Sequence, residues 1–94
     1  MHTFRLGPFG RSFATRGRGS ELREQLLSET IDEDVEIDFT GVEHVSSSFA
    51  DEFLGRLTTD HRDIRVSLLG LGSDVERVVT TVLERRRRIA PACR

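Results

Sequence analysis

The 94-residue sequence contains one cysteine, no lysine and no long apolar run. Cys93 has no second cysteine to pair with, which excludes an internal disulfide, and no histidine or cysteine group has metal-ligand spacing. No stretch approaches the ~20 apolar residues that a membrane span requires. The first residues also lack the apolar centre of a signal peptide. We therefore expect a cytoplasmic location, no membrane partner, no cofactor and no metal.

Charge of both signs is abundant but nearly balanced. All 14 basic residues are arginine and face 16 acidic residues, which leaves a formal net charge of -2. This balance argues against bulk attraction to nucleic acid or acidic membranes. A composition of 36% hydrophobic and 32% charged residues is typical of a globular protein. The length suits one domain with a modest core, over residues 1–94.

Period-2 patterns predict several short strands. In Val35–Phe39 the apolar residues alternate with acidic ones, as in a strand with one buried face, and Ile64–Leu69 alternates in the same way. Weaker patterns predict strands at Thr3–Leu6 and Arg11–Ala14, the second a candidate to pair with the first. We expect Val35–Phe39 to be the central strand.

Helical periodicity appears in three places. Phe49, Phe53 and Leu57 recur every four residues, so a helix should follow the central strand and pack on the sheet. A last amphipathic helix should begin at Ser73, after Gly70-Leu71-Gly72, with its apolar face formed by Val75, Val78, Val79, Val82 and Leu83. The alternation of strands and helices predicts an α/β domain, with a small mixed sheet of about four strands covered by about three helices.

A first helix should precede the central strand, but the residue at which it begins is ambiguous. Thr15 and Ser20 both suit the N-cap position, and two glycines lie between them. We expect a firm helix only over Ser20–Glu29.

Three consecutive serines, Ser46, Ser47 and Ser48, precede the second helix. A helix N-terminus has N–H groups without intrahelical partners and a dipole that favours negative charge, so a phosphate on a serine is tolerated there. Ser48 and Asp51 have the spacing of an N-cap and the residue whose N–H it binds. We therefore expect Ser48 to be the cap and Ser47 to lie just outside the helix, more exposed.

The segment Val35–Leu57 resembles the phosphorylation-site region of STAS domains, the anti-sigma-factor antagonist family. The matching positions are Asp38-Phe39, Val42, Val45 and Ser46-Ser47-Ser48-Phe49. The motif Ser-Phe-Ala-Asp-Glu resembles the STAS-like DUF4325 type more closely still. The likeness extends from about Phe13 to Leu83 and is specific over Asp38–Leu57. It implies a STAS-like fold and, by position, makes Ser47 the candidate phosphoacceptor.

The resemblance also implies a function. The protein would be a non-catalytic regulatory module that docks on a protein partner, an ATPase-fold serine kinase or an anti-sigma-like regulator. A phosphate on Ser47 would add a charge of about -1.5 to -2 and weaken that docking through like-charge repulsion. The candidate partner-binding residues surround it: Ser46, Ser48, His44, Asp51 and Glu52.

Other hypotheses stay open beside this one. Asp51 and Glu52 point about 100° apart on a helix, which favours a role as first-turn acids over shared catalysis. No nucleophile, base and orienting group can be assembled, so we do not expect an enzyme. A constitutive scaffold or homodimer without a phosphoswitch is the main alternative. The run Arg85–Arg88 offers nucleic-acid binding as a third hypothesis, although it also complements the C-terminal dipole of its helix.

Overall fold

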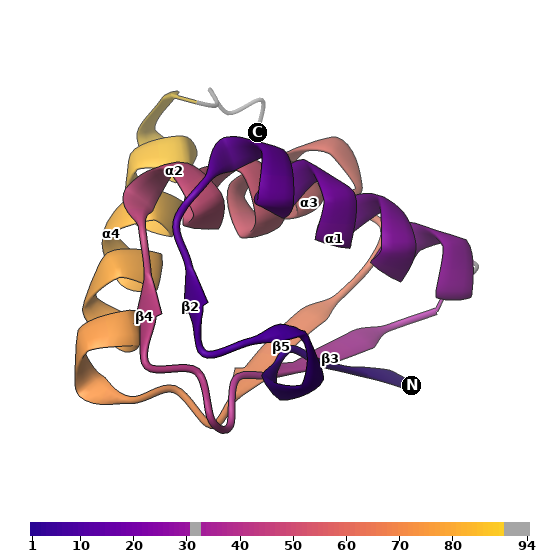
Figure 1. The fold of residues 1–94 in the computed structure, drawn as a ribbon. Coiled ribbons are helices and arrows are strands. Elements are labelled where there is room, and N and C mark those ends of the chain that lie inside the picture. The colour runs from indigo at the N-terminus through magenta and orange to yellow at the C-terminus, as the bar shows by residue number, and fades with distance from the viewer. Residues whose placement is uncertain (31–32, 90–94) are drawn as a thin grey trace.

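The main sheet of the protein has three parallel strands. The computed structural model describes residues 1–30 and 33–89 (Figure 1), so Cys93 and the side chains of residues 87–89 lie outside the description. The strand order is β1 (His2–Arg5), β3 (Val35–Asp38) and β5 (Val66–Leu69), and both pairings are parallel. The predicted central strand is confirmed, and its apolar side chains Val35, Ile37 and Phe39 are buried.

A second sheet of two strands stands apart from the first. β2 (Ser12–Phe13) pairs in parallel with β4 (His44–Val45). The expectation that residues 11–14 pair with the first strand is wrong, because the 3-10 turn η1 (Gly7–Phe9) leads the chain away from the main sheet. The α/β class is confirmed, but two small parallel sheets among the described residues replace the single mixed sheet that we expected.

Three helical stretches of the described chain surround the core. α1 (Arg16–Glu29) starts earlier than expected, because the Thr15 hydroxyl caps it by accepting a 3.1 Å hydrogen bond from the Arg18 N–H. The second stretch is continuous and comprises α2 (Ser47–Ala50), the π-helical segment η2 (Asp51–Gly55) and α3 (Arg56–Asp60). The third is α4 (Ser73–Ile89). None of these helices has the length and apolar character needed to cross a membrane.

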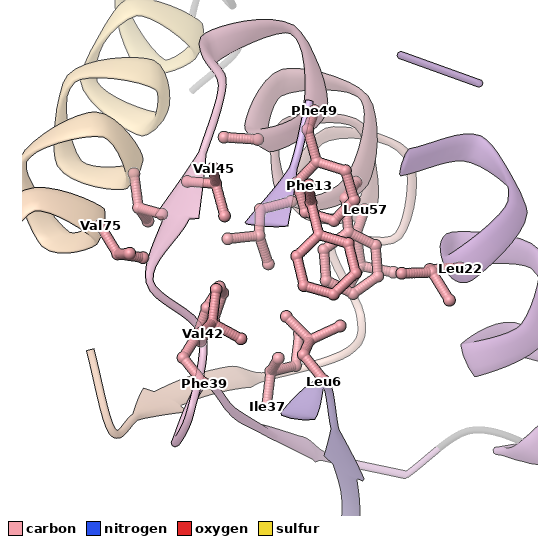
Figure 2. Close-up of a cluster of buried hydrophobic side chains, with 14 of the residues drawn as sticks. Leu6, Phe13, Leu22, Ile37, Phe39, Val42, Val45, Phe49, Leu57 and Val75 are labelled. Atoms are coloured by element: carbon pink, nitrogen blue, oxygen red, sulfur yellow. The ribbon is translucent and has the colours of Figure 1, made fainter. Parts of the chain in front are cut away.

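One apolar cluster fills the space between the helices and the two sheets (Figure 2). Phe53 in η2 is 0% exposed. Its ring centroid lies 5.5 Å from that of Phe49 and 6.2 Å from that of Phe4 in β1. The serine-bearing helix therefore packs its apolar face toward the main sheet, as its periodicity predicts.

A sharp turn after β3 determines where the serines lie. The Asp38 carboxylate accepts hydrogen bonds from the Thr40 N–H (2.9 Å) and hydroxyl (2.6 Å), and Gly41 follows with a φ of 91°. Such a positive φ suits glycine, which has no Cβ to clash. The chain then passes through β4, which leads from the main sheet up to α2 beside α4 (Figure 1). The serines thus lie at the carboxyl end of β4, which separates them from the central strand.

The burial of Phe53 generates a stability prediction. Phe53→Ala should lower the free energy of unfolding by about 3–5 kcal/mol, because it removes an aromatic ring from a closed core. The measurement is urea unfolding followed by circular dichroism. Phe9→Ala is the matched control, since Phe9 stacks on Phe4 at 5.7 Å but is only half-buried. Equal losses in the two variants would contradict the placement of Phe53 at the centre of the core.

Candidate functional site

The three serines have different roles at the start of α2. Ser46 has an extended backbone and is the N-cap, and its Oγ accepts a 3.0 Å hydrogen bond from the Phe49 N–H. The same hydroxyl donates to the Ala14 carbonyl oxygen at 2.8 Å. The prediction that Ser48 caps the helix is therefore wrong: Ser47 and Ser48 are the first helical residues, and both are exposed.

Glu52 is the one buried charged side chain among the described residues, at 8% exposure. Its carboxylate pairs with Arg23 of α1 (Nη1 to Oε2, 3.0 Å), whose Nη1 also donates to the Glu52 main-chain oxygen. Arg16 of α1 (3.3 Å) and Arg56 of α3 (3.6 Å) also form ion pairs with the Glu52 carboxylate. Because a buried carboxylate needs compensating charge, this cluster ties α1 to η2.

Asp51, the neighbouring acid, points instead to α4. Arg86 donates two hydrogen bonds to its carboxylate, from Nε to Oδ1 at 2.7 Å and from Nη2 to Oδ2 at 3.1 Å. Arg16 Nη1 reaches Asp51 Oδ2 at 3.2 Å and so bridges the two acids. Gly55 makes room for this arrangement, since a Cβ there would lie 2.9 Å from Asp51 Oδ1 and 3.0 Å from Arg86 Nε.

Both carboxylates are held in the ionised form. The hydrogen bond from Arg86, aided by Arg16, lowers the pKa of Asp51 below its usual value. Burial raises the pKa of Glu52, but the hydrogen bonds from Arg23 and Arg16 outweigh burial, so its pKa also lies below the usual value. Neither carboxylate is free for proton transfer, because both already form ion pairs with arginine side chains.

A pocket of about 270 Å³ opens beside the serine turn. Its lining residues come from α1, α2, η2 and α4: Arg16, Ser47, Ser48, Asp51, Arg85 and Arg86. Within the described part of the chain, Arg85 and the hydroxyls of Ser47 and Ser48 have no hydrogen-bond or ion-pair partner. We call this site the arginine pocket; it combines unoccupied hydroxyls with an excess of positive charge.

The predicted site residues are only partly brought together here. Ser47, Ser48 and Asp51 line the arginine pocket. Ser46 is used as a cap, Glu52 is buried under α1, and His44 is an exposed residue of β4, so these three do not line it. No group of histidine, cysteine or acidic residues in the described ranges could hold a metal ion.

Sequence reasoning missed the arginines of α1. Arg16 and Arg23 are seven residues apart, so they lie on one face of the helix. That spacing is a weak signal, because it does not reveal which acids the face will meet. Arg85 and Arg86 were visible only as part of a basic run, whose last two side chains lie outside the description.

The capping geometry yields one prediction. Ser46→Ala should cost about 0.5–2 kcal/mol of stability, since it leaves the Phe49 N–H without its side-chain acceptor. Ser48→Ala should stay within about ±0.5 kcal/mol, because Ser48 is exposed and caps nothing. Thermal and urea unfolding of both variants provide the comparison. A larger loss in Ser48→Ala would restore Ser48 as the cap.

The Asp51–Arg86 ion pair yields a second prediction. Arg86→Gln should raise the pKa of Asp51 and reduce stability at pH 7 by about 1–3 kcal/mol. The folded pKa of Asp51 is depressed, so the pair's contribution is complete above the unfolded value of about 3.9 and disappears as pH falls through the lower folded value. Urea unfolding from pH 7 to about pH 2 should show the variant and wild type converging.

Arg77→Gln is the control for that series, since Arg77 is an exposed residue of the same helix that pairs with Asp74 at 3.4 Å. It should change stability little at any pH. A deficit in Arg86→Gln that persists undiminished at the acid end would contradict the proposed ion pair.

A family model matches more than half of the chain. Residues 18–76 match the family model described as a STAS-like domain of unknown function (DUF4325). The match contains the whole of Asp38–Leu57, the segment that carries the specific resemblance. No curated protein and no solved structure matches the chain. Since the match covers more than half of the sequence, the chain belongs to the family of STAS-like domains of unknown function (DUF4325).

Proposed function

We propose that this protein is a non-catalytic regulatory module that docks through its serine turn and is switched by phosphorylation of Ser47. The proposal rests on the exposure of the Ser47 side chain, its lack of a hydrogen-bond partner and its position at the arginine pocket. Ser47 is exposed, its hydroxyl has no hydrogen-bond partner among the described residues, and it lines the arginine pocket. A hydroxyl with no structural duty is accessible to a modifying enzyme at little cost to the fold.

The charges around Ser47 support a different electrostatic effect from the one expected. We expected a phosphate there to meet Asp51 and Glu52, but arginines hold both acids. The lining of the pocket has three arginines and one aspartate, so its net charge is positive. A docking partner would therefore present an acidic surface, and a phosphate on Ser47 would cancel the attraction.

The partner we propose is an ATPase-fold serine kinase or an anti-sigma-like regulator. Membership of a STAS-like family supports this choice by resemblance to the anti-sigma-factor antagonists. In this arrangement the partner supplies the nucleotide, and this chain contributes the acceptor serine and the surrounding arginines. No catalytic group on this chain is required.

A constitutive homodimer is the second candidate. Pairing through the helix that bears Phe49 and Phe53 is disfavoured, because these side chains are 1% and 0% exposed and face the core. The edge strand β5 offers another surface, because Leu69 at its end is 37% exposed and its outer side has no strand partner among the described residues. An open strand edge favours pairing with another chain.

The functional prediction concerns Ser47→Asp. Incubation with ATP and an ATPase-fold serine kinase of the proposed partner class should place phosphate on Ser47, mapped by mass spectrometry, and Ser47→Asp should weaken partner binding about tenfold in calorimetry. Ser73→Asp is the matched control, because Ser73 is an exposed serine at the first position of α4 but does not line the pocket. It should bind as wild type does.

Ser47→Ala should keep both fold and binding while losing the modification. If phosphate is absent from wild type and Ser47→Asp binds normally, the phosphoswitch is wrong. Sedimentation of the chain alone as a dimer would then favour the homodimer.

A further inference from the structure

We propose that the arginine pocket is an oxyanion site that takes a phosphate group. The phosphate has two possible sources with one chemistry: a phosphoryl group on the chain's own serine, or a phosphate carried by a separate ligand. The site itself does not depend on any kinase, because its binding groups are present in the unmodified chain.

The donors converge from segments that are distant in the sequence. Arg16 comes from the first turn of α1, and Arg85 and Arg86 come from the last turns of α4. Guanidinium groups are planar forks whose N–H groups match the oxygens of a phosphate. Ser47 and Ser48 add two unpartnered hydroxyls at the same pocket.

The ion pairs inside the pocket leave donors unused. Asp51 engages Nε and Nη2 of Arg86, and Nη1 of Arg16 is shared between Asp51 and Glu52. Arg85 has no partner in the described part of the chain. The pocket therefore keeps free guanidinium donors even while its acid is fully paired.

The net charge of the pocket lining favours an anionic ligand. Three arginines and one aspartate line the pocket, which leaves a positive excess of two. A phosphate monoester carries about -1.5 to -2 at neutral pH, so it matches this excess, whereas a cation would be repelled. The volume of about 270 Å³ accommodates the group with its ester oxygen directed outward.

Inorganic phosphate is the first probe. It is titrated against ¹⁵N-labelled protein at constant ionic strength, with sodium chloride as the compensating salt. We expect saturable amide shifts centred on Ser47 and Ser48. Arg85→Gln should weaken the affinity about three- to tenfold, because it removes one charged donor without touching the Asp51 pair. Arg77→Gln, on the exposed face of the same helix, should bind as wild type does.

Unsaturable shifts, or equal loss in Arg85→Gln and Arg77→Gln, would overturn the site. Arg16→Gln gives a second test from α1, and it should weaken phosphate binding as well. Circular dichroism of each variant verifies that the fold is retained.

A chain carrying phosphoserine at position 47, introduced during synthesis, distinguishes the two sources. If the chain's own phosphate fills the pocket, added inorganic phosphate should no longer bind, and Arg85→Gln should raise the second pKa of the phosphoserine seen by ³¹P NMR. Retained binding of inorganic phosphate would assign the site to a separate ligand. Phosphate binding by a chain that no kinase modifies would support the site while the proposed phosphoswitch fails.

Discussion

The burial of Glu52 is the constraint on which the rest of the site depends. A carboxylate at 8% exposure must be compensated, since removing one partner from a buried pair typically costs about 3–5 kcal/mol. Arg23 and Arg16 supply that compensation from α1, so this helix cannot shift without exposing an unpaired charge. Arg16 also reaches Asp51, and Asp51 holds Arg86 of α4. One chain of ion pairs thus joins α1, η2 and α4 around the serine turn.

The π-helical segment makes this connection possible. A π turn contains one more residue than an α turn, and such bulges often occur at functional sites. In η2 all of Glu52–Gly55 is buried, with Phe53 in the core and Glu52 under α1. Gly19 of α1 permits the close approach, because a Cβ there would lie 2.9 Å from the Phe49 carbonyl oxygen. Glu52 therefore pairs with Arg23 of α1 and Asp51 with Arg86 of α4, while Arg16 contacts both acids.

Ser47 and Ser48 are consequently neutral, exposed residues beside a pocket whose lining has an excess of positive charge. Ser46 anchors the start of α2 to Ala14, and this leaves Ser47 and Ser48 with no structural task. The fold is consistent with the STAS-like family to which the chain belongs, and the matched residues include this turn. The positive charge of the arginine pocket is the physical reason to expect that a negative charge added to this turn would change the proposed docking.

Local pattern determined much of this fold. The burial of Val35–Phe39 and the inward face of Phe49, Phe53 and Leu57 follow from alternation and helical periodicity, which any chain segment expresses by itself.

Which serine caps the helix is not a local matter. Ser46 and Ala14 are 32 residues apart, and Asp51 and Arg86 are 35 apart. The pairing of β2 with β4 is equally long-range. Only tertiary structure decides such contacts, because hydrogen bonds and ion pairs depend on distances that the folded chain creates and that residue order does not specify.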